Sequence, residues 1–205
     1  NTLRRRLILF FATDLFACSY QAGIDLYGKN AKFTVINNSI DCARFAYNPA
    51  VRAQVRQAMG LNNKFVICNI SRLEIYKNHT FLLDVFAEVY KKNKNAVLML
   101  AGGGSIEEEL KAKALNLDLK DAVLFLGPRK DSEALLQAAD CFVFPSLFEG
   151  FGIAALEAQA AGLPCLLSCG VPKEAAVVNC RALPLELGPQ IWAEEVLTFA
   201  NFNRQ

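Results

Sequence analysis

The chain has very little histidine, because His79 is the only one among its 205 residues. A Ser-His-Asp catalytic triad would have to use this residue. Its neighbours Asn78 and Thr80 are typical of the start of a helix, so we expect His79 to have a structural or solvated role. If the chemistry of this protein needs a catalytic histidine, this chain does not carry it.

The chain also has no Cys-x-x-Cys pair, although it contains seven cysteines. Their number is odd, and most of them lie in apolar runs, as Cys18, Cys68 and Cys141 do. Cys165 and Cys169 are four residues apart, but glycine and proline surround them and no histidine is near. These features predict buried free thiols in a reducing cytoplasm and exclude a disulfide framework or a zinc site.

Long apolar runs and dense basic stripes are absent as well. The net charge is +2, which argues against electrostatic binding of nucleic acid. The one tight basic cluster, Arg4–Arg6, precedes an apolar run at 7–12 that is far too short to span a bilayer. We expect a cytoplasmic protein with a solvated helix start here, and peripheral contact with anionic lipid at the inner face of the membrane is the alternative.

Two common phosphate-binding motifs are missing. Gly102–Gly104 does not fit G-x-G-x-x-G, and G-x-x-x-x-G-K-[ST] occurs nowhere in the chain. A dinucleotide-dependent dehydrogenase and a P-loop ATPase are therefore disfavoured. The three glycines allow either close backbone approach to a ligand or simply a tight turn.

Short apolar runs alternate with helical patterns along the whole chain. Strands are expected at 14–19, 32–36, 65–70, 96–101, 122–126, 141–144, 164–168 and 182–185. Helices are expected at 1–12, 20–27, 49–59, 80–92, 105–115, 131–139, 153–161 and 189–202, with a capping box of Ser105 and Glu108 and with Asp131 as a cap. This alternation predicts an α/β fold, a Rossmann-like parallel sheet with helices on both faces.

The stretch from Phe144 to Gly162, FPSLFEGFGIAALEAQAAG, holds the strongest functional signal. Gly150 and Gly152 lie where a helix begins, so free N–H groups and the positive end of the helix dipole make an anion site. Glu149 lies at its mouth and would be free to reach a neutral, hydroxyl-rich group. Glu157 lies in an almost wholly apolar helix, where a buried carboxylate needs hydroxyl donors such as those of a ribose.

Other expected strand ends carry cations. Arg72 and Lys77 flank a loop before a helix, which suits a diphosphate, because arginine offers a fork and lysine a point charge. The alternative is that both are surface cations paired with Glu74. Arg129, which follows Gly127, could frame a base or lie on the surface. Because ligands bind at the carboxyl ends of parallel strands, these corners are expected to share one site.

These residues resemble the donor-binding half of the retaining glycosyltransferases called glycosyl transferases group one, which have the two-lobed GT-B architecture. The resemblance covers roughly residues 14–192 and is strongest in PSLFEGFGIAALEAQAAGLPCLLS, which carries the E-x7-E pattern in Glu149 and Glu157. ISRLEIYKNH, NNSID, LAGGGS and LFLGPR are similar to four further family corners. Ser71 and Ser39 depart from the family pattern, which usually has glycine at both positions.

The resemblance implies catalytic roles for Arg72, Lys77 and Glu149. Arg72 and Lys77 would hold the donor diphosphate, and Glu149 would lie against the donor sugar. The donor would be a UDP-, GDP- or ADP-sugar, and neither a cofactor nor a metal is expected, because the cations and the helix dipole stabilise the leaving group. The further substrate-binding residues implied are Ser71, Gly103, Arg129, Gly150, Phe151, Gly152 and Glu157.

The resemblance further implies that the chain, residues 1–205, is a donor-binding fragment of a hexosyltransferase-type enzyme whose N-terminal acceptor lobe is absent. The run NNSID and PKEAAV is closest to bacterial capsule or exopolysaccharide transferases, which act on glycan or lipid-linked acceptors. We expect the isolated chain to be inactive and to need its own N-terminal lobe. Two alternatives stay open: a nucleotide-binding or interaction lobe without catalysis, and a sugar-nucleotide epimerase of related architecture.

Overall fold

The computed structural model describes residues 2–204, and its main body is a six-stranded parallel sheet. The strands run in the order β5-β4-β3-β6-β7-β8. In chain order they are β3 (Phe65–Ile70), β4 (Ala96–Ala101), β5 (Val123–Phe125), β6 (Cys141–Phe144), β7 (Cys165–Ser168) and β8 (Cys180–Leu183). All six had been predicted from the alternation of apolar runs, and three have the expected bounds.

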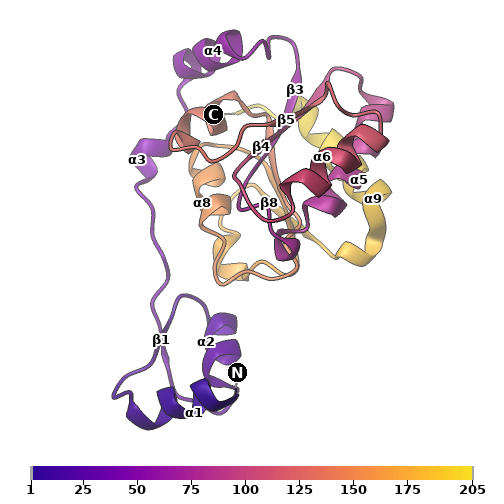
Figure 1. Cartoon of the computed structure of the whole chain (residues 1–205). Coiled ribbons are helices and arrows are strands. Elements are labelled where there is room, and N and C mark those ends of the chain that lie inside the picture. Colours follow the sequence, from indigo (N-terminus) through magenta and orange to yellow (C-terminus); the bar gives the residue numbers. More distant parts are fainter. Residues whose placement is uncertain (1, 205) are drawn as a thin grey trace.

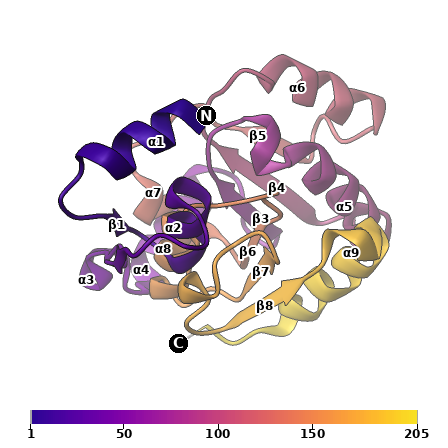
Figure 2. The same ribbon diagram turned by 90° about the horizontal axis from the view of Figure 1, so that it is seen from below.

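Helices connect successive strands, as parallel pairing requires, and further helices precede β3 and follow β8. They are α3 (Cys42–Phe45), α4 (Pro49–Ala58), α5 (His79–Lys92), α6 (Glu107–Asn116), α7 (Ser132–Ala138), α8 (Ile153–Ala160) and α9 (Gly188–Thr198), with short 3-10 helices η1 (Ile75–Lys77), η2 (Lys173–Ala175), η3 (Leu185–Leu187) and η4 (Phe199–Asn201). Figure 2 shows α5 and α9 on one side of the sheet and α7 and α8 on the other. The predicted Rossmann-like parallel sheet with helices on both faces is confirmed.

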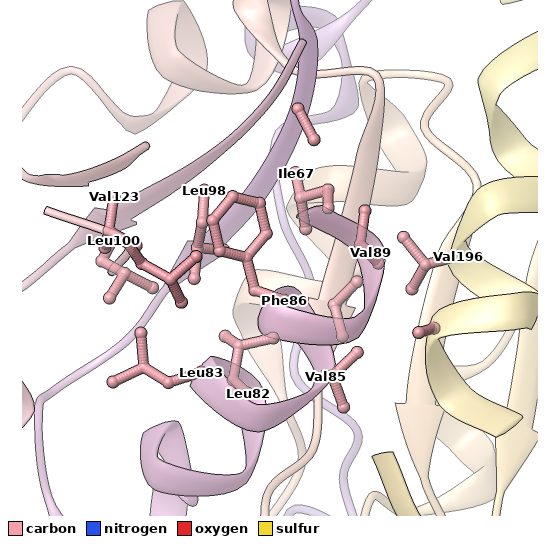
Figure 3. Packing of buried hydrophobic residues seen from close by; sticks show 14 of the residues in the cluster. Ile67, Leu82, Leu83, Val85, Phe86, Val89, Leu98, Leu100, Val123 and Val196 are labelled. Carbon is pink, nitrogen blue, oxygen red and sulfur yellow. The ribbon is translucent and has the colours of Figure 1, made fainter. Parts of the chain in front are cut away.

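Each face of the sheet carries its own hydrophobic core. On the first face, Phe86 of α5 is fully buried and points towards Ile67 and Leu98 of the sheet (Figure 3). Trp192 and Val196 of α9 join the same cluster and anchor the last helix to the sheet. The second core packs α7 and α8 against the opposite face.

The first 36 residues fold apart from this sheet. Their elements are α1 (Thr2–Phe11), β1 (Phe16–Ala17), α2 (Tyr20–Tyr27) and β2 (Thr34–Val35). Figure 1 shows this group at one end of the molecule, joined to the main body through the segment that carries α3. The strands expected at 14–19 and 32–36 form in part, as β1 and β2, but they pair in parallel with each other and not with β3–β8.

Helix α1 confirms the helix expected near the start, although Asn1 lies outside the described residues. Several apolar side chains of this part of the chain face solvent, and Phe10 and Phe11 are 81% and 74% exposed. Among residues 2–204, no helix is both long enough and apolar enough to cross a membrane.

Two predicted helix caps do not form. Ser105 donates its backbone N–H and its hydroxyl to the carboxylate of Glu74, at 3.3 and 2.8 Å, so it does not form a capping box with Glu108. Asp131 does precede α7, but its carboxylate accepts two hydrogen bonds from Arg129 instead of capping the helix. In both places a charged or polar side chain nearby offers a better partner than the local backbone.

The seven cysteines are all free thiols, as predicted. Cys68, Cys141 and Cys165 are fully buried, and burial raises the pKa of each well above its ordinary value. Cys18, which was also expected to be buried, is only partly so.

The strand order reverses at the centre of the sheet. The chain moves outward from β3 through β4 to β5, then returns to β6 beside β3 and moves outward on the other side. Ligands of such sheets bind in the crevice at this switch point, outside the carboxyl ends of the strands. The loops that follow β3 and β6 are therefore the first place to look for a site.

Candidate functional site

The loop after β3 carries Arg72 and Lys77 as expected. Arg72 donates to the hydroxyl of Tyr76, and its guanidinium lies 5.8 Å from the centre of that ring. Lys77 ends the short 3-10 helix η1, and Asn78 follows it in the left-handed region, with φ of 59°. This left-handed residue turns the chain directly from η1 into α5.

The loop after β6 meets this cation loop through a nearly buried ion pair. The Nζ atom of Lys77 lies 2.5 Å from Oε1 of Glu149, and the two side chains are only 13% and 9% exposed. Ser146 also donates its hydroxyl to Glu149, at 2.7 Å. The expectation that Glu149 is free is therefore wrong. Lys77 pairs with Glu149 and not with Glu74, which was the alternative.

Two further contacts hold these loops together. The backbone N–H of Leu147 donates to the carbonyl oxygen of Tyr76, at 2.8 Å. The rings of Tyr76 and Phe148 are stacked, with their centroids 5.3 Å apart. Arg72, Lys77 and Glu149, which the sequence placed on two separate corners, thus belong to one connected structure at the switch point.

Gly102–Gly104, after β4, pack directly against the cation loop. A Cβ atom at Gly102 would lie 1.9 Å from the carbonyl oxygen of Ser71, and one at Gly104 would lie 2.2 Å from that of Leu73. Leu73 also donates its backbone N–H to the Gly103 oxygen, at 3.0 Å. Glycine is needed here because the two loops run in backbone contact.

A hollow with a volume of about 520 Å³ opens between these corners. It is lined by Ile70, Ser71, Arg72, Ala101, Gly102, Gly103, Gly104, Pro128 and Arg129. Three of the predicted substrate-binding residues, Ser71, Gly103 and Arg129, thus share one cavity. Arg129 is also exposed and paired with Asp131, at 2.6 Å, which agrees with a surface role, whereas contact with a base stays a prediction.

The start of α8 supplies the expected backbone geometry. Gly152 has φ of 95°, a left-handed conformation that other residues rarely adopt. No side chain among the described residues caps α8, so its first N–H groups stay available to an anion. Phe151 is only 4% exposed and belongs to the second core, so its side chain anchors the loop and only its backbone is placed to meet a ligand.

Glu157 was predicted to be a buried carboxylate, but it is only half-buried. Helix α8 leaves Ile153 43% exposed, so it is not apolar and buried on every side. Burial raises the pKa of Glu157, and the nearby charges of Arg44 and Glu133 oppose and reinforce this shift, respectively. This carboxylate is therefore partly desolvated and reachable, which still suits hydroxyl donors.

A buried polar network lies beneath the cation loop. Asn69 donates its amide N–H to the carbonyl of Val143 on β6, at 2.8 Å, which turns its oxygen towards Ser71 and His79. His79 is fully buried, so its solvated alternative is wrong, and burial followed by the charge of Lys77 lowers its pKa to about 4. Asn69 within an apolar strand was the one sequence signal for this network.

The corner after β7 also supports the Glu149 loop, which the sequence did not indicate. Gly170 accepts the backbone N–H of Glu149, at 3.0 Å. A Cβ atom at Gly170 would lie 2.2 Å from the carbonyl oxygen of Leu147. This glycine is therefore required for the close packing of the two loops.

Within residues 2–204, no group of three or more histidine, cysteine or acidic side chains is arranged to hold a metal ion. The loops at the switch point of the parallel sheet combine Arg72 and Lys77, the Glu149 carboxylate, a glycine-lined hollow and the start of α8. The six-stranded parallel sheet with helices on both faces is the fold of the Rossmann-like lobes found in GT-B glycosyltransferases.

The chain belongs to the family of glycosyl transferases group 1, whose family model matches residues 51–179. It is 34% identical over 207 aligned residues to EpsF of Bacillus subtilis (strain 168), which is named as a glycosyltransferase. The alignment covers 98% of this chain and 54% of EpsF. It is 35% identical over 150 residues to the UDP-Gal:alpha-D-GlcNAc-diphosphoundecaprenol alpha-1,3-galactosyltransferase of Escherichia coli, covering 70% and 38% of the two chains. The chain thus spans about half the length, or less, of these relatives.

Among solved structures, the fold is similar to that of Anabaena Alr3699/HepE in complex with UDP and glucose. The TM-score is 0.87 at 25% sequence identity, over 98% of this chain and 57% of the other. The agreement covers the separate N-terminal elements as well as the six-stranded sheet, since almost the whole chain is superposed.

Proposed function

We propose that this chain binds the nucleotide-sugar donor of a retaining glycosyltransferase that builds a bacterial capsule or exopolysaccharide. The observation that carries the proposal is the meeting of Arg72, Lys77 and Glu149 at the switch point, beside the glycine-lined hollow. A diphosphate brings two or three negative charges to this position. Fixed cations and helix N–H groups offset such charge where it develops on a leaving nucleotide.

The residues divide the donor between them. Arg72 and Lys77 hold the diphosphate, with the backbone N–H groups of Gly150 and Gly152 beside it. Glu157 accepts hydroxyl groups of the ribose, and the hollow at Gly103 and Arg129 receives the base. Bound diphosphate competes with Glu149 for Lys77, and this exchange frees the Glu149 carboxylate to accept hydroxyl groups of the donor sugar.

The acceptor, a glycan or a lipid-linked glycan, is assigned to a further lobe of the whole protein, and the isolated chain transfers no sugar. Similarity to a galactosyltransferase named for a diphosphoundecaprenol-linked sugar supports this choice of acceptor. The enzyme works in the cytoplasm, with peripheral contact at the inner face of the membrane where the acceptor is lipid-linked.

Calorimetric titration tests the proposal. The chain is titrated with UDP, GDP, ADP and their sugars, without and with magnesium. One nucleotide is expected to bind in both conditions, and Arg72→Ala is expected to weaken its binding at least about tenfold, because a charge-assisted hydrogen bond is worth roughly 1.5–3 kcal/mol.

Arg181→Ala is the matched control, because Arg181 is an exposed arginine that pairs with Glu195 at the far edge of the sheet. This variant should bind like the wild type. Equal loss in both variants would contradict the assigned role of Arg72, and sugar transfer by the isolated chain would contradict the need for a second lobe.

A further inference from the structure

The N-terminal elements touch the donor site at one turn, where β1 leads into α2. Ser19 is fully buried there and donates its hydroxyl to the carbonyl oxygen of Gly150, at 2.7 Å. The two residues are 131 positions apart in sequence and belong to parts of the chain that do not share a sheet. Because Gly150 directly follows Glu149, this hydrogen bond acts on the centre of the proposed site.

The Ser19 hydroxyl has two partners and uses both of its capacities. Besides donating to Gly150, it accepts the backbone N–H of Ala22, at 3.1 Å, as the cap of α2. A buried hydroxyl with a donor and an acceptor partner is fixed in one orientation. The start of α2 and the Gly150 carbonyl are therefore held at a defined distance from each other.

Neighbouring atoms of the same turn strengthen the contact. The Sγ atom of Cys18 lies 3.4 Å from the Gly150 oxygen. The backbone N–H of Tyr20 donates to Glu174, at 3.3 Å, and Glu174 lies in η2 beyond β7. One turn of the N-terminal part thus contacts both loops that surround the Glu149 corner.

The Gly150 carbonyl has consequences for the residues around it. Its orientation fixes the peptide plane that it shares with the N–H of Phe151, at the approach to α8. Without the Ser19 hydrogen bond, this segment would be held by Glu149, by the buried Phe151 ring and by the weak contact of Cys18 Sγ with the Gly150 oxygen. A glycine on each side of Phe151 makes the segment intrinsically mobile in the absence of such restraints.

We infer that Ser19 is a positioning residue for the donor loop: through the Gly150 carbonyl it holds Glu149 and the backbone N–H groups before α8 in the geometry that receives the nucleotide sugar. Ser19 also links donor binding to the docking of residues 13–36 on the main sheet. If this docking strengthens donor binding by ordering the loop at 149–152, then a bound donor must strengthen the docking by the same free energy. The identity of the ligand rests on the proposed function, whereas the role of Ser19 in holding the loop at 149–152 does not.

The test compares Ser19→Ala, which loses both hydrogen bonds, with Ser19→Thr, which keeps both. Asn48→Ala is the matched control, because Asn48 caps α4, away from the site, in the same manner. UDP affinity is measured by calorimetry, and amide hydrogen exchange is followed at residues 149–152. Ser19→Ala is expected to weaken UDP binding about fivefold and to speed exchange at 149–152.

Ser19→Thr should stay within about twofold of the wild type, and Asn48→Ala should bind UDP unchanged. Ser19→Asp adds a sharper arm, since a carboxylate still caps α2 but repels the Gly150 oxygen, and it should behave like Ser19→Ala or worse. Unchanged UDP binding and exchange in Ser19→Ala would overturn the inference, as would an equal loss in Asn48→Ala.

If the wild type binds no nucleotide, the proposed function fails and exchange alone decides the inference. Faster exchange at 149–152 in Ser19→Ala, but not in Ser19→Thr or Asn48→Ala, would uphold the positioning role. Equal exchange in all four proteins would refute it.

Discussion

Replacing Lys77 by methionine should destabilise the protein even without ligand. The change removes the charge but keeps most of the side-chain length, and it leaves Glu149, which is only 9% exposed, with Ser146 as its remaining side-chain partner. Removing one partner of a buried ion pair typically costs about 3–5 kcal/mol, because the other charge stays desolvated. We expect about 3 kcal/mol, the lower end, since 13% of the Lys77 side chain reaches solvent.

Urea unfolding followed by circular dichroism measures this loss. In a thermal scan the same loss corresponds to about 6–12 °C in Tm for a domain of this size. The double variant Lys77→Met/Glu149→Gln removes both charges while keeping the Ser146 hydrogen bond, and it should recover to within about 1 kcal/mol of the wild type.

Lys91→Met is the control, because Lys91 forms an exposed pair with Glu88 in α5 and should cost less than about 0.5 kcal/mol. The reasoning fails if Lys77→Met costs no more than this control, or if the two changes at the Lys77–Glu149 pair are additive. Either result would mean that the pair is solvated and not held in a nearly closed site.

Three other predictions concern residues around the site. Gly104→Ala should lower stability by several kcal/mol and abolish nucleotide binding, because its Cβ would lie 2.2 Å from a backbone oxygen. In the control Gly150→Ala, the new Cβ meets only Cys18 Sγ, at 3.6 Å, so this variant should unfold at nearly the wild-type urea concentration. Similar losses of stability in both variants would contradict the steric argument. His79 has its pKa lowered from 6.5 to about 4, mainly by burial, so the unfolded state binds a proton that the fold excludes. The contribution of His79 is therefore complete above pH 6.5 and falls by up to about 3 kcal/mol towards pH 4. Urea titrations across this range should show a steeper slope in the wild type than in His79→Gln, in which only carboxylates such as Glu74 still titrate. Glu157→Gln should leave stability at pH 7 unchanged or slightly raised, because burial raises the pKa of this carboxyl and its ionisation therefore costs free energy in the folded state. The same variant should weaken nucleotide binding about tenfold or more. A gain in both stability and nucleotide affinity would rule out a role in ribose binding.

Local patterns were enough to predict the main sheet and its helices. Apolar runs of four to six residues between amphipathic segments placed β3, β4 and β6 with the observed bounds, because burial on both faces of a parallel sheet requires such runs. Glycines at the strand ends likewise marked the corners where loops pass close to one another, as at Gly102 and Gly104.

Patterns of this kind could not reveal which strands pair. The runs at 14–19 and 32–36 look like the others, yet they form a sheet of their own, because the chain between β2 and α3 is extended and carries them away from β3. Pairing of parallel strands depends on long-range contacts that no local propensity encodes.

The sequence by itself determined the fold class, the family and the residues that meet at the switch point, because periodicity and motif spacing are local properties. Only the tertiary structure decided how those residues are partnered: Lys77 with Glu149, Glu74 with Ser105, His79 beneath the cation loop and Ser19 against Gly150. All of these contacts except those of His79, whose partners are local, join segments from different parts of the chain. Burial selects such partners by lowering the solvation of polar groups until the nearest complementary group is preferred to water.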